Sequence, residues 1–384
     1  MAANWERYLE RWMNAGLIDS RTAESVRTYE TGQAKARGFS WPVLLTITLG
    51  GIMLAAGILL FVAAHWDQLS PTERFALVLA LVAVMHVGGA TAATRFAILS
   101  TALHAVGTIC LGAGIFLTGQ LFHLQEHWPS GVMLWALGAG MAWALLRDWP
   151  QAALTALLAP SWLAGEWLEA TGGWTGGGTI LAAGLLMLAI CYLTALHPEK
   201  GTPVRRALSW IGGLTVIPAV AAVIQSGTFA SWQHLTLPWH YHLIGWVAAF
   251  LLPLTLAWLL RGKRIWLNVI AALWVGALSA ISLRPRAHHG MWVYSLNDPG
   301  LYALCALGSV GLIVWGLKES RKERVNLGVA GFALTILFFY FSTVMDKLGR
   351  SASLVGLGVL FLLGGWFLEK TRRRLLVGIG KDKA

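Results

Sequence analysis

The sequence predicts an all-α integral membrane protein, a polytopic bundle of about twelve transmembrane helices that follows a short N-terminal helical hairpin. Of its 384 residues, 57% are hydrophobic and only 12% are charged, whereas an ordinary soluble domain has about 25% charged residues. The apolar residues also fall into blocks of roughly 18 to 25, long enough for a helix to cross ~30 Å of hydrocarbon. The chain is therefore expected to cross a lipid bilayer many times.

Composition divides the chain into three regions. Residues 1–40 are polar and mixed in charge, residues 41–369 contain the apolar blocks, and residues 370–384 form a basic tail. The first region lacks the apolar core and the small-residue cleavage site of a secretory signal peptide. We therefore expect a cytoplasmic helical hairpin, a transmembrane helical bundle and a cytoplasmic tail, in that order.

The first helix of the predicted hairpin is amphipathic. Its apolar residues recur at helical spacing and form one face: Trp5, Tyr8, Leu9, Trp12 and Met13. Gly16 can end this helix in a left-handed cap, and Asp19 or Ser20 can begin a second helix. The apolar face either packs against that second helix or docks on the membrane surface or on a membrane or cytoplasmic protein partner.

Twelve apolar blocks are the candidate transmembrane spans. They are residues 42–64, 74–93, 96–121, 129–146, 150–168, 177–197, 206–226, 241–260, 264–283, 299–317, 325–344 and 351–368. Pro160 interrupts the fifth block, and a glycine-rich run opens the sixth. Glycines also recur inside spans, as in the pairs Gly212 with Gly213 and Gly308 with Gly311, where small residues let helices approach closely in lipid.

The distribution of basic residues predicts the orientation of the bundle. With the N-terminus inside, 24 of the 29 Lys and Arg residues lie on inner segments and 5 on outer segments. An excess of Lys and Arg in cytoplasmic loops is the positive-inside rule. We therefore expect both the N-terminus and the C-terminus to be cytoplasmic.

Three stretches resemble a known family. They are WMNAGLIDSRTAE from Trp12, AHWDQLSP from Ala64 and GQLFHLQEHWPSG from Gly119. Each is similar to the bacterial predicted membrane proteins catalogued as domain of unknown function 2157, and the likeness covers the N-terminal part of the chain. The resemblance implies a cytoplasmic helical hairpin followed by a multi-pass region in the bacterial inner (cytoplasmic) membrane, with no established activity. It implies no catalytic or binding residues.

The sequence disfavours several classes of function. No Asp, Glu, Lys or Arg lies near the middle of a predicted span, and intramembrane charges are the usual mark of proton relays and ion pathways. The net charge of +11 comes without a basic stripe interleaved with aromatic residues, so no nucleic-acid partner is expected. The cysteines, Cys110, Cys191 and Cys305, lie inside apolar blocks, so no disulfide framework is expected.

His86 and His104 are the deep polar residues of most interest. They lie on consecutive, antiparallel predicted spans, about 12 residues from the outer end of one and about 8 from the inner end of the other, which places them at similar depth. They could face each other as a proton-sensitive pair, since the pKa of an imidazole can lie near neutrality. The alternative is that each stays neutral and bonds a Ser, a Thr or a carbonyl group of a neighbouring helix.

Other histidines gather on the predicted outer segments, where imidazole and carboxylate groups suit zinc, copper, nickel or iron. The candidate metal ligands are His65, His123, Glu126, His127, His240 and His242. Within this set, His123, Glu126 and His127 match the H-x-x-E-H pattern of inverted zinc peptidases. Pro129 closes that segment and no partner motif with a third ligand is identifiable, so the match is a weak signal that can readily arise by chance. The sequence identifies no cofactor.

Three functions stay open at this point. Because neither a buried charge nor a catalytic set is apparent, the sequence favours a non-enzymatic accessory or assembly protein of the membrane. A transporter or channel for a neutral, lipid-like or metal solute is suggested by the number of spans and by the interruptions at Gly112, Pro160, Pro218 and Pro253. A metal-dependent enzyme at the periplasmic face would rest on the outer histidines.

Overall fold

The structure of the chain is a computed structural model that describes most of the sequence. The described residues are 4–37, 69–121, 127–196, 201–229, 237–283, 286–288, 291–293 and 299–344, with the single positions 49, 53, 358, 359 and 362. Contacts within the chain divide it into two compact units, residues 1–74 and 75–384.

The first unit begins with helix α1 (Asn4–Asn14), which ends where glycine permits a left-handed turn. Gly16 has a φ of 67°, a conformation that costs glycine nothing sterically. The N–H of Leu17 donates to the carbonyl of Trp12 at 3.0 Å, and the N–H of Gly16 donates to that of Met13 at 3.0 Å. These two bonds form a Schellman motif, which satisfies carbonyls at the helix end. The predicted cap at Gly16 is present.

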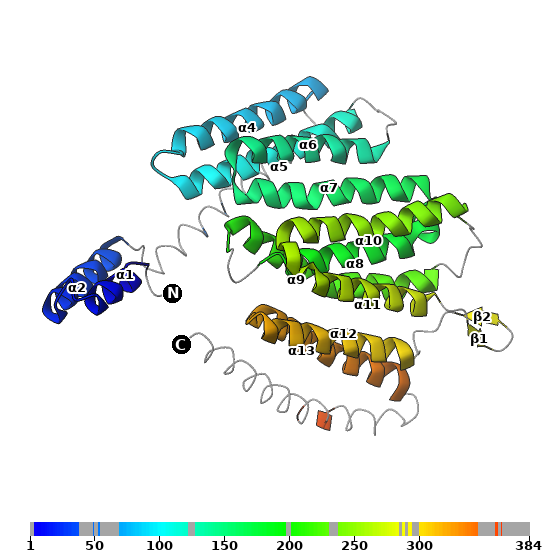
Figure 1. Ribbon diagram of the computed structural model, residues 1–384. Coiled ribbons are helices and arrows are strands. Elements are labelled where there is room, and N and C mark those ends of the chain that lie inside the picture. Colours follow the sequence, from blue (N-terminus) through cyan, green and yellow to red (C-terminus); the bar gives the residue numbers. More distant parts are fainter. Residues whose placement is uncertain are drawn as a thin grey trace. The chain divides into compact units, whose positions relative to one another are not determined.

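Helix α2 (Ser20–Arg37) starts directly after this turn. The Asp19 carboxylate accepts a hydrogen bond from the backbone N–H of Thr22 at 3.3 Å, so Asp19 is the N-cap residue. Helices α1 and α2 lie side by side (Figure 1), with Leu9 of α1 and Ala23 of α2 buried. Leu9 alone among the described side chains of the predicted apolar face is buried.

The remaining described helices follow in sequence order. They are α4 (Pro71–Ala92), α5 (Ala97–Leu121), α6 (Trp128–Leu146), α7 (Trp149–Ala170), α8 (Trp174–Leu193), α9 (Pro203–Phe229), α10 (Trp239–Arg261), the 3-10 turn η2 (Gly262–Ile265), α11 (Trp266–Ser282), α12 (Pro299–Lys318), α13 (Lys322–Phe339) and the π-helical turn η3 (Tyr340–Val344). Helix α4 begins with a capping box, in which the Glu73 carboxylate accepts from the N–H of Ser70 at 2.7 Å.

A two-stranded ribbon interrupts the helical pattern between α11 and α12. Strand β1 (Arg286–His288) pairs antiparallel with β2 (Met291–Val293), with Ala287 opposite Trp292. The sequence did not predict these strands, because three residues per strand are too few for a period-2 pattern to be visible. The described residues are otherwise almost entirely helical.

Within the described residues, eight helical segments are long and apolar enough to cross a membrane, and one of them, Trp239–Ser282, covers α10, η2 and α11 together. Helix α7 coincides with the predicted span 150–168 but is not among the eight. The predicted spans 42–64 and 351–368 fall almost wholly outside the described residues. The count of twelve spans therefore stays a prediction.

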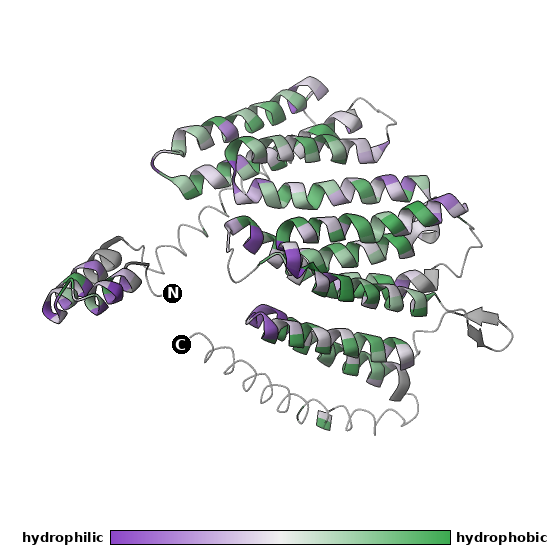
Figure 2. Cartoon of the chain, in the orientation of Figure 1, coloured by the Kyte–Doolittle hydropathy of each residue, from purple (hydrophilic) through white to green (hydrophobic). Residues whose placement is uncertain are grey.

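The second unit has the surface expected of helices in lipid. Hydrophobic residues cover most of the length of its helices, and hydrophilic residues gather near helix ends (Figure 2). Large apolar side chains such as Leu251, Leu259 and Leu273 are exposed. In water these exposed apolar surfaces would be unfavourable, whereas lipid tails accommodate them.

Helix α8 lies at the centre of the packing in this unit. Ala182, Ala183, Leu186 and Met187 are fully buried and belong to a core cluster shared with α9, α10 and α11. A Cβ atom at Gly212 of α9 would lie 2.1 Å from the backbone nitrogen of Leu193. Glycine is therefore required where α9 meets α8, as expected for close helix approach.

Candidate functional site

The structure places His86 of α4 and His104 of α5 in direct contact. Their Nδ1 atoms lie 3.1 Å apart, and their ring centroids are 5.3 Å apart. His104 is buried and His86 is half-buried. A hydrogen bond between two Nδ1 atoms requires that one ring carries its proton on Nδ1 and that the other Nδ1 is bare. The two imidazoles therefore differ in tautomer when both are neutral.

Glycine makes room for both rings. A Cβ atom at Gly89 of α4 would lie 2.8 Å from the ring of His104, and one at Gly107 of α5 would lie 2.8 Å from the ring of His86. Each imidazole thus fills a notch in the opposite helix. The hydroxyl of Thr108 donates to the carbonyl of His104 at 3.1 Å, so the His104 backbone is satisfied locally.

Replacing the two histidines with alanine, singly and together, should reveal the energetic coupling between them. We expect the loss of unfolding free energy for the double variant His86→Ala/His104→Ala to differ by about 1 kcal/mol from the sum of the single losses, because each single exchange already breaks the shared hydrogen bond. Reversible unfolding in mixed detergent micelles would measure all three. His240→Ala, at an exposed position on α10, is the control and should change stability by less than about 0.5 kcal/mol. Strictly additive losses of unfolding free energy would contradict a direct interaction between the two histidines.

A second polar group joins the start of α6 to the end of α7. His127 Nε2 lies 2.7 Å from Glu166 Oε2, Trp162 Nε1 donates to Glu166 Oε1 at 2.9 Å, and Trp128 Nε1 donates to Glu169 Oε1 at 2.6 Å. His127 and Glu166 are exposed. Both carboxylates therefore accept from side chains of these two helices, an arrangement that ties the helices together at one end.

Of the other predicted metal ligands, only His240 and His242 lie among the described residues. His65, His123 and Glu126 lie outside the described residues. His240 and His242 are exposed in the first turn of α10, and the His240 ring lies against Trp239 and Tyr241. Among the described residues, no three His, Cys, Asp or Glu side chains come together as metal ligands would.

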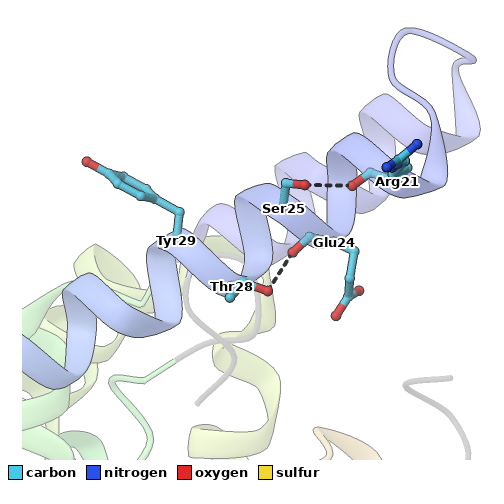
Figure 3. Close-up of a pocket in the computed structure, with 5 residues that line it drawn as sticks. All are labelled: Arg21, Glu24, Ser25, Thr28 and Tyr29. Atoms are coloured by element: carbon cyan, nitrogen blue, oxygen red, sulfur yellow. Dashed lines mark hydrogen bonds between the residues drawn. The ribbon is translucent and has the colours of Figure 1, made fainter.

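A shallow pocket opens on α2 (Figure 3). It is lined by Arg21, Glu24, Ser25, Thr28 and Tyr29. The hydroxyl of Ser25 donates to the carbonyl of Arg21 at 3.0 Å, and that of Thr28 donates to the carbonyl of Glu24 at 2.9 Å. Both hydroxyls are thus engaged by their own helix. No nucleophile and base converge among these five residues.

The structure also contains a buried cluster that the sequence did not predict, which we name the arginine–glutamate triad: Arg261, Glu319 and Arg324. Glu319 follows α12, Arg261 ends α10 and Arg324 lies in the first turn of α13. Arg261 Nη2 pairs with Glu319 Oε1, and Arg324 Nη1 lies 2.6 Å from Glu319 Oε2. The side chains of Arg261, Glu319 and Arg324 are 0%, 7% and 2% exposed.

The two arginines of the triad, together with Arg205, also cap the C-terminal end of α8. Three consecutive carbonyl groups after α8 each accept from an arginine: Thr194 from Arg261 at 2.6 Å, Ala195 from Arg205 at 3.0 Å, and Leu196 from Arg324 at 3.0 Å. The last carbonyls of a helix lack intrahelical donors and carry a partial negative charge. Arginines from three other helices therefore supply both the missing donors and the favourable charge.

The surroundings of Glu319 keep it ionised. Burial raises the pKa of Glu319, but the positive charge of Arg324, together with hydrogen bonds from Arg261, Arg324 and Trp315, outweighs burial and lowers the pKa to about 2. Trp315 Nε1 donates to Glu319 Oε1 at 2.8 Å, and the Arg261 guanidinium lies 5.3 Å from the centroid of the Trp315 ring. The carboxylate is negative at any physiological pH.

One signal in the sequence could have indicated the triad. Arg261 and Arg324 were counted as loop cations for the positive-inside rule, which assumes exposure to water. Glu319 is an acid within a run of basic residues, and Trp315 precedes it by one helical turn. A carboxylate in such a turn is a natural partner for buried cations.

The fold defines a class: the chain is a multi-pass helical membrane protein. Residues 10–152 match the family model described as "Predicted membrane protein (DUF2157)". The N-terminal part of the chain is therefore similar to this family of predicted membrane proteins of unknown function, which confirms the resemblance. The curated proteins and the solved structures compared with the chain gave no match.

Proposed function

We propose that the chain is a non-enzymatic accessory or assembly protein of the bacterial cytoplasmic membrane, in which α1 and α2 recruit a protein partner. One observation carries this proposal: the aromatic face of α1 is largely uncovered. The side chains of Tyr8, Trp12 and Met13 are 48%, 43% and 37% exposed. Exposed aromatic residues in contiguous apolar patches are typical of protein interaction sites.

The geometry of this face suits a groove on a partner. The rings of Tyr8 and Trp12 lie one helical turn apart, with centroids 6.4 Å from each other, and the Arg11 guanidinium lies 5.2 Å from the Tyr8 ring centroid. Such spacing is that of anchor residues in helix-in-groove recognition. Aromatic and arginine side chains are also the residue types that dominate binding energy at interfaces.

The charge of the unit favours a protein partner over the lipid surface. Residues 1–40 contain six basic and five acidic residues, so the unit is nearly neutral. Helices that lie on anionic membranes are instead rich in Lys and Arg on their polar face. We therefore propose a protein as the occupant of this face. The predicted positive-inside orientation supports a cytoplasmic location for α1 and α2.

Neither alternative function gains support from the described residues. Transporter sites are commonly built from broken helices, but α7, α9 and α10 continue through Pro160, Pro218 and Pro253. An enzyme at the outer face would need convergent metal ligands, and His127 in the described part instead pairs with Glu166.

Site-specific cross-linking in cells tests the partner. A photoreactive amino acid at position 12 of the full chain is expected to cross-link one discrete protein, whereas the same group at position 29, an exposed aromatic position on α2, should not. With that protein purified, Tyr8→Ser/Trp12→Ser should weaken its binding to the full chain at least tenfold, since anchor residues at interfaces each contribute about 2 kcal/mol or more. Tyr29→Ser is the matched control. Cross-links to lipid alone, or equal binding by both variants, would overturn the proposal.

A further inference from the structure

The triad brings two turns together that are far apart in the sequence. One turn joins α10 to α11 at residues 261–266, and the other joins α12 to α13 at residues 318–324. Together they contain seven basic residues and two acidic ones. Because Glu319 pairs with Arg261 and Arg324, the cations of both turns share one end of the second unit, where hydrophilic residues colour the ends of α12 and α13 (Figure 2).

Several other cations of these two turns lie close to the triad residues in the sequence and are exposed. Lys263, Arg264, Lys318 and Lys322 are exposed, whereas Arg261 and Arg324 direct their guanidinium groups to Glu319 and to carbonyls of the α8 end. One negative charge on Glu319 balances only one of the two buried arginines. The buried triad therefore adds a net positive charge to a patch of exposed cations.

An aromatic residue and an apolar surface continue this patch. Lys318 Nζ lies 4.6 Å from the centroid of the Trp266 ring, and Trp266, the first residue of α11, is 47% exposed. Farther along α11, Ile270 and Leu273 are also exposed. Tryptophan favours the headgroup region of a bilayer, where one edge of its ring is wet. A cation, an aromatic side chain and apolar side chains thus follow one another from the first residue of α11 along that helix.

We propose that the two turns form a binding site for the headgroup phosphate of an anionic glycerophospholipid. Lys263, Lys318 and Lys322 bind the phosphate and glycerol oxygens, Trp266 lies at the level of the glycerol backbone, and the exposed face of α11 contacts an acyl chain. Clusters of Lys and Arg at helix ends recognise anionic lipids electrostatically. A free phosphate ion would bind the same lysines but would not contact Trp266 or the exposed face of α11.

Lipid titration of the purified full chain tests this site. Phosphatidylglycerol is expected to be retained in native mass spectra from detergent and to raise the melting temperature, whereas phosphatidylcholine, inorganic phosphate and glycerol 3-phosphate are not. Lys263→Gln/Lys318→Gln/Lys322→Gln should weaken phosphatidylglycerol binding about 100-fold, since three surface cations act together. The control is Arg95→Gln/Arg147→Gln, which removes exposed cations from the turns after α4 and α6 and should leave binding unchanged.

Two results would overturn the proposal of a phospholipid-binding site. One is equal retention of phosphatidylcholine; the other is stabilisation by inorganic phosphate that matches stabilisation by the lipid. If the triple variant fails to fold, each single Lys→Gln exchange should still weaken phosphatidylglycerol binding about fivefold, and three unchanged single variants would equally reject the proposal. Trp266→Leu should weaken lipid binding while leaving any binding of free phosphate unaltered.

Discussion

Glu319→Gln is expected to lower the free energy of unfolding by about 3–5 kcal/mol, because it leaves two buried guanidinium groups without their counter-charge. The side chains of Arg261 and Arg324 are almost completely buried, so water cannot replace the lost carboxylate. Reversible unfolding in mixed detergent micelles would measure the loss.

Glu323 offers a control for that exchange in the same turn. It is exposed, in the first turn of α13, so Glu323→Gln should change stability by less than about 0.5 kcal/mol. Equal losses for the two variants would show that the turn, and not the buried ion pairs, is responsible. A Glu319→Gln variant as stable as the parent would contradict the role of the triad.

The lowered pKa of Glu319 predicts that the stability of the fold depends on pH. The pKa of Glu319 falls from an ordinary 4.5 to about 2 in the folded chain, so its contribution is fully present above pH 4.5 and is lost as the pH falls from about 4.5 towards 2. That depression corresponds to about 3 kcal/mol. Comparing unfolding at pH 7 and pH 3 should show a smaller acid-induced loss for Glu319→Gln than for the parent chain. Parallel pH curves would contradict this assignment.

Gly212→Ala should destabilise the fold by about 1–3 kcal/mol, because the added methyl group would push the backbone of α9 away from that of α8. The added Cβ would lie 2.1 Å from the Leu193 nitrogen and 2.4 Å from the Ala189 oxygen, and neither backbone atom can move without shifting its helix. The measurement is again reversible unfolding of the purified chain.

The neighbouring glycine supplies the matched control. A Cβ atom at Gly213 would meet only a side-chain carbon of Leu193, at 3.8 Å, which is ordinary van der Waals contact. Gly213→Ala should therefore be neutral or stabilise α9 by up to about 1 kcal/mol, the difference in helix propensity. Should both exchanges behave alike, the close approach of the two helices would be rejected.

Periodicity and length were sufficient to locate most of the helices. Helix α6, for example, begins at Trp128 and ends at Leu146, one residue earlier than the predicted start and at the predicted end. The cap at Gly16 was predictable because glycine is the residue for which a left-handed turn has no steric cost. The ribbon β1–β2 was not, because its pairing depends on two short segments meeting across a turn.

For the candidate sites, the difference between what the sequence predicted and what only the structure shows is larger. Depth along two antiparallel helices was enough to suggest that His86 and His104 meet, since rise per residue is fixed. Which way each ring turns depends on the notches at Gly89 and Gly107. For the histidines of the predicted outer segments, the sequence indicated only that they share one side of the membrane. In the structure, His127 lies against Glu166, a residue 39 positions away in the chain.

The sequence by itself determined that the chain is helical, apolar and multi-pass. The hydropathy of a span depends only on the residues within it, and not on which helices pack against it. Only the tertiary structure decided which charges are buried. Arg261 and Arg324 look like loop cations in the sequence, yet the fold sets them against Glu319 and the open carbonyls of α8. The energy of a charge depends on what surrounds it in space, and a sequence records only what precedes and follows it along the chain.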